Sequence, residues 1–137
     1  MKGITSYLSF DGNCREAMTF YRDCLGGKLE FQTVGESAMS EKMPERMKES
    51  ILHATLTKKG FQLLGSDLVS NDGLMRGNAV SLMLRFSTKK EIHATYEKLS
   101  RGGKATYPLE INFWGALFGG LTDKYGVHWL LHYHQHK

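Results

Sequence analysis

The stretch Tyr7-Leu8-Ser9-Phe10, followed by a helical segment and then by Gly26-Gly27-Lys28, decides the fold because it occurs twice. It returns as Met83-Leu84-Arg85-Phe86, a second helical segment and Gly102-Gly103-Lys104, at a constant offset of 76 residues without a gap. A later hairpin turn also returns, at an offset of 66, and the ten-residue difference falls in a long loop of the first half. Ordered landmarks of this kind predict two copies of one structural module.

Each copy has the pattern strand, helix and three strands. Alternating β-forming residues predict strands, and apolar residues at positions i, i+3, i+4 and i+7 predict helices that end at glycine pairs. In the first copy these elements cover residues 4–10, 14–25, 28–34, 51–57 and 61–65. In the second copy they cover residues 79–86, 88–101, 104–109, 113–123 and 127–134.

The length of 137 residues suits one domain. We therefore expect a single α+β domain, residues 1–137, made of two βαβββ modules at about 1–68 and 79–137. One helix covers only one face of a four-stranded sheet, so the other face of each module needs a partner. Two such modules can form a partly open, barrel-like sheet around a ligand-sized cavity. We expect a small-molecule ligand there.

The composition excludes several classes of protein. Hydrophobic residues make up 41% and charged residues 23%, and the net charge is +4, which is typical of a globular domain rather than a disordered chain or a coiled coil. The chain has no apolar run of membrane length and begins with no secretory signal pattern, so we expect a cytoplasmic protein that contacts no membrane. No arginine-rich stripe predicts a nucleic-acid partner.

The two cysteines and the longest loop leave alternatives open. Cys14 and Cys24 flank the first predicted helix and are interpreted as free thiols, with a catalytic cysteine as the alternative. The loop over 35–50 contains Met39, Met43 and Met47 and is either a lid over a pocket or a surface excursion whose methionines pack on the body.

Several short motifs resemble one known group of proteins. They are Phe113-Trp114-Gly115, Asp123-x-x-Gly126-x-x-Trp129, Leu52-His53-Ala54 and Gly65-Ser66-Asp67. Together with the repeat they span nearly the whole chain and resemble the vicinal-oxygen-chelate superfamily of glyoxalase I, bleomycin-resistance proteins and extradiol dioxygenases. Within it the chain is most similar to the PhnB-like group, often labelled 3-demethylubiquinone-9 3-methyltransferase. The sequence gives this methyltransferase label little support, because no glycine-rich loop for S-adenosylmethionine follows a strand here.

The resemblance implies a divalent metal held by His, Gln or Glu side chains from the first and last strand of each module. The matching positions in this chain are Ser6, Leu64, Leu82 and Leu130. Serine and leucine cannot hold such a metal, a shift by one residue brings in no better donor, and a shift by two brings in only Gln62 and His128. We therefore expect no metal site and no cofactor.

His53 is the candidate catalytic residue. It lies near the start of a strand, where it either faces the cavity as a general base or ligand donor, or is a buried, hydrogen-bonded strand histidine. Asp67 is a candidate acidic partner for it.

Aromatic side chains are the candidate ligand contacts. We expect Trp114 to stack on a flat ligand, with Tyr7 and Phe10 as further pocket walls, whereas Phe113 either joins Trp114 or fills the barrel. The alternating histidines 132, 134 and 136 near the C-terminus favour adventitious metal binding over a functional site.

Three functions remain open at this point. The first is a protein that binds or transforms a small metabolite in a metal-free cavity, through His53 and Trp114. The second is a non-catalytic protein that sequesters a compound, as the resistance proteins of the superfamily do. The third is a metal-dependent lyase, isomerase or dioxygenase with a rearranged site that uses His53 and His128. The resemblance also implies a homodimer.

Overall fold

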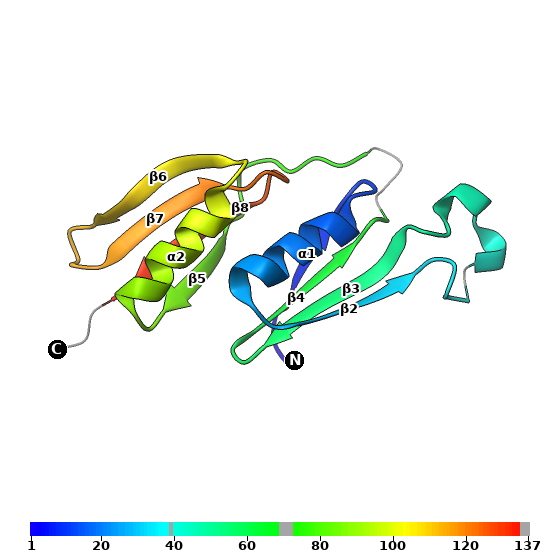
Figure 1. Ribbon diagram of the computed structural model, residues 1–137, viewed down its shortest axis with the longest axis horizontal. Helices are drawn as coiled ribbons and strands as arrows, with labels where there is room; N and C mark the ends of the chain where they lie inside the picture. Colours follow the sequence, from blue (N-terminus) through cyan, green and yellow to red (C-terminus); the bar gives the residue numbers. More distant parts are fainter. Residues whose placement is uncertain (39, 69–72, 135–137) are drawn as a thin grey trace. The chain divides into compact units, whose positions relative to one another are not determined.

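The computed structural model describes residues 1–38, 40–68 and 73–134 and divides the chain into two compact units, Met1–Met75 and Arg76–Lys137 (Figure 1). Both units follow the predicted order of strand, helix and three strands. Unit 1 contains β1 (Ser6–Ser9), α1 (Cys14–Leu25), β2 (Lys28–Thr33), β3 (Ile51–Lys58) and β4 (Phe61–Ser66). Unit 2 contains β5 (Leu82–Phe86), α2 (Lys89–Ser100), β6 (Lys104–Ile111), β7 (Leu117–Thr122) and β8 (His128–Tyr133).

The two sheets share one topology, and their strand pairing confirms the internal repeat. The strand orders are β1-β4-β3-β2 and β5-β8-β7-β6, so the first strand of each unit lies parallel to the last. Tyr7 lies beside Leu64 in unit 1, and Met83 lies beside Leu130 in unit 2. These two pairs are related by the offsets of 76 and 66, so the repeat holds at the level of single residues.

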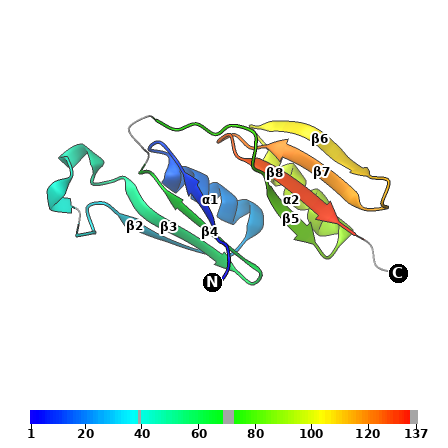
Figure 2. The ribbon, with the colours of Figure 1, turned by 180° about the vertical axis from the view of Figure 1, so that it is seen from behind.

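Each helix covers one face of its own sheet (Figure 1), and the view from behind shows the opposite face without a helix (Figure 2). In unit 1, α1 packs closely on β4 at Gly65. A Cβ atom there would lie 3.1 Å from the Met18 Sδ and 3.2 Å from the Cys14 Sγ, so the glycine permits the close approach. The sheet face opposite the helix is called the open face of each unit below.

The helix of unit 2 is fixed by a side-chain cap and a tyrosine. The Thr88 hydroxyl accepts a hydrogen bond from the Glu91 N–H, which satisfies one free donor of the first turn. The Tyr96 hydroxyl lies 2.8 Å from the Tyr107 carbonyl oxygen and 3.0 Å from that of Gly120, and its single proton is shared between them where the pairing of β6 and β7 is irregular. Burial raises the pKa of Tyr96. No helix in the described ranges is long and apolar enough to cross a membrane.

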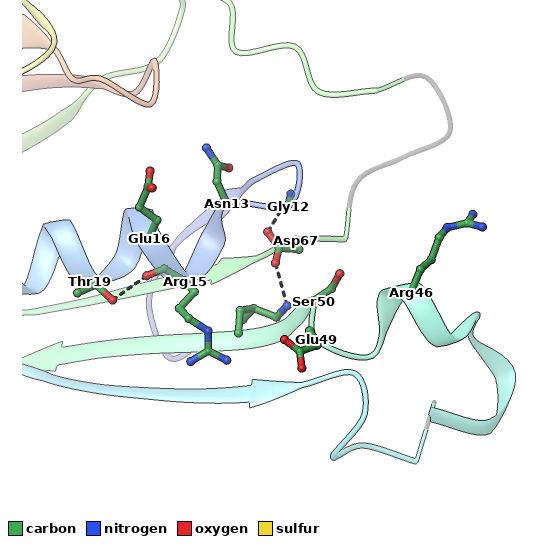
Figure 3. A pocket seen from close by; sticks show the side chains of 10 residues that line it. Gly12, Asn13, Arg15, Glu16, Thr19, Arg46, Glu49, Ser50 and Asp67 are labelled. Carbon is green, nitrogen blue, oxygen red and sulfur yellow. Dashed lines mark hydrogen bonds between the residues drawn. The ribbon is translucent and has the colours of Figure 1, made fainter.

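A buried carboxylate joins three segments of unit 1 (Figure 3). The Asp67 Oδ1 accepts hydrogen bonds from the N–H groups of Gly12 and Cys14, at 3.0 and 2.8 Å, and its Oδ2 accepts one from the Ile51 N–H at 2.8 Å. The N-cap residue Asn13 makes no side-chain cap bond of its own. Asp67 therefore ties the end of β4 to the start of α1 and the start of β3.

A second buried carboxylate explains the Asp-x-x-Gly-x-x-Trp motif. The Asp123 Oδ1 accepts hydrogen bonds from the N–H groups of Tyr125 and Val127, at 2.8 and 3.1 Å, which shapes the β7–β8 turn. Its Oδ2 accepts a 2.8 Å hydrogen bond from the Trp129 Nε1. Trp129 is buried, so this motif holds the turn and the core of unit 2 together.

The prediction of a strand over 113–123 is wrong at its start. Residue 112 begins a turn, because the Asn112 Oδ1 accepts hydrogen bonds from the N–H groups of Trp114 and Ala116, both at 3.0 Å. Gly115 completes the turn with a φ of +79°, which favours glycine. β6 consequently reaches Ile111, beyond its predicted end, and β7 begins only at Leu117.

The 35–50 loop is an excursion from the β2–β3 connection. The N–H of Val34 donates to the Ser50 carbonyl, and the N–H of Gly35 donates to the Lys48 carbonyl, so the two ends of the loop are paired. Two short 3₁₀ helices lie inside it, Ser40–Lys42 and Glu45–Met47. Met43 and Met47 are half-buried, and Met39 lies outside the described residues.

We expect Asp67→Ala to lower the free energy of unfolding by about 2–4 kcal/mol, because three backbone donors lose their acceptor together. Asp67→Asn retains one carbonyl oxygen and should cost less. Urea titrations followed by far-ultraviolet circular dichroism, which reports on both units, measure both changes. Asp11→Ala, at an exposed site in the same β1–α1 loop, is the control, and an equal effect of Asp11→Ala and Asp67→Ala would contradict this role.

Candidate functional site

Tyr7 and His53 come together on the open face of unit 1. Residues paired across neighbouring strands point to the same side of a sheet, so the pairs Tyr7–Leu64 and Leu64–Thr55 place Tyr7 and Thr55 on one face. His53 lies two residues before Thr55 on β3 and shares that face. The rings of Tyr7 and His53 are 6.4 Å apart between centroids, tilted by 40°. Tyr7 is 55% exposed, and His53 is exposed as well, so the alternative of a buried strand histidine is wrong.

Polar side chains surround this ring pair. Gln32 lies opposite His53 on the neighbouring strand, and Glu30 lies opposite Thr55. Gln62 is on the same face of β4, two residues before Leu64. The open face of unit 1 therefore offers an imidazole, a phenol, two amides and a carboxylate around one leucine. Such a set can bind a polar molecule and exchange a proton with it.

Asp67 is not the partner of His53. Both oxygens of its carboxylate accept hydrogen bonds from backbone N–H groups at the start of α1 and of β3. Asp67 is only 9% exposed. The prediction that it is the acidic partner of His53 is therefore wrong. A carboxylate used in this way stabilises the fold of unit 1 rather than the charge of an imidazole.

Phe10 is a core residue of unit 1. It is 0% exposed, its ring lies 6.5 Å from that of Tyr21 on α1, and its N–H donates to the Ser66 carbonyl. Alternation along the chain places it on the side of α1, whereas Tyr7 lies on the other side. This placement corrects the expectation that Phe10 walls a pocket together with Tyr7.

Phe113 and Trp114 lie at the tip of the β6–β7 turn. Their exposed fractions are 91% and 76%, and their ring centroids are 4.9 Å apart. Phe113 therefore does not fill the interior of unit 2, because the turn set by Asn112 directs it away from the sheet. The predicted ligand-stacking role of Trp114 stays a prediction, and its exposed ring is free to act in that way within unit 2.

Strand pairing identifies the open-face positions that correspond to the superfamily's metal ligands. Ser6 and Leu82 pair with Leu63 and Trp129, two buried residues, so they belong to the helix-covered faces. The neighbouring positions on the open faces are Tyr7, Leu64, Met83 and Leu130. A phenol, two alkyl groups and a thioether do not fit a site made of His, Gln or Glu. In the part of the chain that the structure describes, no three His, Cys, Asp or Glu residues form a metal-binding group.

His128 is held by two hydrogen bonds on the open face of unit 2. Its Nε2 lies 2.8 Å from the Gly77 carbonyl oxygen, which can only accept, so the Nε2 carries a proton. Its Nδ1 lies 2.8 Å from the Thr122 hydroxyl, which donates to it when the imidazole is neutral. A metal site that used His128 would have to break one of these bonds.

The C-terminal histidines continue along β8. The rings of His132 and His134 stack at 6.5 Å with an angle of 13° between their planes, so these two side chains share one face. His136 lies outside the described residues. Two imidazoles alone do not complete a metal-ligand set.

A polar pocket of about 640 Å³ lies beside the start of α1, between the helix and the 35–50 loop (Figure 3). Arg15 and Glu16 from α1, and Arg46 and Glu49 from the loop, contribute side chains of opposite charge to its lining. The Arg15 guanidinium lies 4.9 Å from the centre of the Phe31 ring. No sequence motif predicts this pocket, because its residues come from segments about 30 positions apart. The lid role of the loop stays a prediction.

Cys14 has the properties of a structural thiol. It is 0% exposed and lies against Gly65 under the first turn of α1. Burial, reinforced by the charge of Asp67 and opposed by Arg15, raises the pKa of Cys14 to about 12. A thiol of this kind carries almost no thiolate near neutral pH, so the interpretation as a catalytic cysteine is disfavoured.

A curated relative is similar to this chain in sequence, and solved structures share its architecture. Protein YjdN of Escherichia coli (strain K12) is 30% identical in an alignment 141 residues long, and the alignment covers 93% of this chain and 92% of YjdN. Protein PA1353 of Pseudomonas aeruginosa has a TM-score of 0.87 at 35% identity and covers 99% of this chain and 100% of its own. The Bacillus cereus "Putative 3-demethylubiquinone-9 3-methyltransferase, PhnB protein" has a TM-score of 0.75 at 31% identity and covers 96% and 99%.

The fold defines the class of protein first. Paired βαβββ units with helix-free sheet faces are the glyoxalase/bleomycin-resistance fold, and a glyoxalase-related enzyme of Fulvimarina pelagi shares that fold at a TM-score of 0.66 and 18% identity, covering 97% of this chain and 88% of its own. The family model described as 3-demethylubiquinone-9 3-methyltransferase matches residues 2–132. The chain belongs to this PhnB-like family.

We expect the Cys14 thiol to resist Ellman's reagent in the folded protein near pH 8 and to react fully in denaturant. Its raised pKa also sets a sign: above pH 9 the unfolded thiol ionises while the folded one keeps its proton, so stability falls as the pH rises from 9 towards 12. Cys24→Ala leaves Cys14 as the only thiol for this measurement. Fast labelling of the native variant would contradict the structural role.

Proposed function

We propose that this PhnB-like protein binds a small polar metabolite on the open face of unit 1, through Tyr7 and His53. The observation that carries the proposal is the exposed ring pair on that face, 6.4 Å between centroids. Exposed aromatic and imidazole groups side by side on a helix-free sheet face have no packing role within unit 1. Both groups are therefore available to contact a bound ligand.

The chemistry of the face supports a polar ligand. The ring nitrogens of His53 and the hydroxyl of Tyr7 can each form a hydrogen bond with a ligand. Gln32 and Gln62 add amide groups that both donate and accept. Strands hold these side chains on a rigid sheet, which reduces the entropy lost when a ligand is bound.

Binding alone and binding followed by turnover are both compatible with this face. A general acid–base role for His53 would make the protein an enzyme, and the Tyr7 hydroxyl would orient the substrate. Without turnover the same residues would sequester the ligand. Trp114 is the further proposed contact, for a flat part of the ligand. The cavity between the modules, the homodimer, the cytoplasmic location and the absence of a nucleic-acid partner stay predictions.

A ligand screen tests the proposal. A library of small polar metabolites is screened by thermal shift, and the hits are tested for turnover. We expect His53→Ala and Tyr7→Phe each to weaken a hit by about threefold to tenfold per lost hydrogen bond, without loss of the fold. His93→Ala, an exposed histidine on α2, is the matched control. Hits that bind both variants as tightly as the unchanged chain would refute the site, and stable binding without turnover would identify a sequestering protein.

We further propose that the chain acts without the superfamily's metal, because its open-face positions carry a phenol, two alkyl groups and a thioether. Elemental analysis of the purified full chain should find divalent metal well below one equivalent. His134→Ala serves as a control for adventitious binding at the C-terminal histidines. A stoichiometric metal that is lost on His53→Ala or His128→Ala would instead support the metal-dependent alternative.

A further inference from the structure

The polar pocket of about 640 Å³ beside the start of α1 lies wholly within unit 1. Helix α1 and the 35–50 loop form its two walls (Figure 3). We propose that this pocket binds a small zwitterion that carries an ammonium group and a carboxylate, as a free amino acid does. The site goes beyond the function proposed above, because none of the residues that line the pocket belongs to the Tyr7–His53 face.

Each wall of the pocket contributes one positive and one negative side chain. Arg15 and Glu16 come from the first turn of α1, and Arg46 and Glu49 come from the last part of the loop. All four residues are exposed, and within the described residues none of the four takes part in an ion pair. The pocket therefore offers cationic and anionic groups that are available to a ligand.

An aromatic ring holds Arg15 in place. The guanidinium lies over the ring of Phe31 on β2, with its central carbon 4.9 Å from the ring centre. A guanidinium that stacks on a ring keeps the N–H groups at its edge for a carboxylate, which it can bind through two parallel hydrogen bonds. Arg15 can therefore hold the carboxylate of a ligand, and Arg46 adds a second positive charge from the other wall.

Asp67 supplies a buried negative charge to the same pocket. It lines the pocket although it is only 9% exposed, and Figure 3 shows it between the start of α1 and Ser50. Its Oδ2 accepts one hydrogen bond, from the Ile51 N–H at 2.8 Å, and a carboxylate oxygen can accept two. In the described part of the chain no Lys or Arg pairs with this carboxylate. An ammonium group of a ligand can supply both a further donor and a positive charge.

The balance of charges selects for a molecule that carries both signs. The carboxylates of Glu16, Glu49 and Asp67 line the pocket together with two guanidinium groups. A simple anion would approach the carboxylates without a compensating positive charge, and a simple cation would leave the guanidinium groups without a partner. The hydroxyls of Thr19 and Ser50 add partners for a polar side chain of the ligand. The volume is in the range of small-molecule sites, so a single amino acid fits.

Three probes that share one skeleton test the proposal on the full, ¹⁵N-labelled chain. L-Glutamine carries both charges, glutaramate lacks the ammonium group, and 4-aminobutanamide lacks the carboxylate. In ¹H–¹⁵N spectra we expect glutamine to shift the amides of Gly12, Glu16 and Ser50. Each analogue should bind about threefold to tenfold more weakly, because each loses one set of charge-assisted hydrogen bonds at a partly exposed site.

Variants that remove one charge from the loop wall separate the two ends of the ligand. Glu49→Gln should weaken 4-aminobutanamide more than glutaramate, and Arg46→Gln should weaken glutaramate more than 4-aminobutanamide. Glu97→Gln and Arg101→Gln, each of which breaks an exposed ion pair at the end of α2, are the matched controls and should leave all affinities unchanged. His53→Ala should also leave glutamine binding unchanged, so the failure of either site does not decide the other. No glutamine shifts around the pocket, equal binding of the probes, or the same loss for both analogues in Glu49→Gln and Arg46→Gln would each overturn the proposal.

Discussion

One helix covers one face of each four-stranded sheet, and the organisation of both units depends on this one-sided packing. In unit 1 a close contact occurs where Met18 and Cys14 lie against Gly65. The buried residues at alternate positions of the two neighbouring strands are Ala54, Leu56, Leu63 and Gly65. Side chains on the other face of the same strands remain free of that packing. Because the strand period is two, a single register decides which residues join the core and which are available for binding.

Two buried aspartates maintain that register at the ends of strands. Asp67 accepts hydrogen bonds from N–H groups at the start of α1 and of β3 in unit 1. Asp123 accepts hydrogen bonds from the β7–β8 turn and from the indole of Trp129 in unit 2. Neither is equivalent to the other in the internal repeat, so each unit uses its own carboxylate. Residues that look like acid–base candidates in the sequence thus stabilise the scaffold, and the chemistry is left to groups on the open faces.

The placement of the candidate residues was only partly predictable. The sequence singled out Tyr7 and His53, and the structure brings their rings to 6.4 Å between centroids on one sheet face, while their role in binding stays a prediction. The expectation that Phe10 walls a pocket beside Tyr7 did not agree with strand alternation, since positions three apart on a strand point to opposite sides. For Trp114 and its neighbour Phe113 the strand assignment itself was wrong, because the hydrogen bonds of Asn112 are not visible in a hydrophobic pattern.

The sequence by itself determined the two βαβββ modules, their boundaries to within a few residues, and the family. Repeated landmarks at constant offsets show that one module occurs twice, and the helices and strands within each module follow from local patterns of the chain. Only the tertiary structure decided which carboxylates are used by backbone donors, and that the two ring nitrogens of His128 both have hydrogen-bond partners. These features join residues from different elements, and their distances depend on how the chain packs rather than on its pattern.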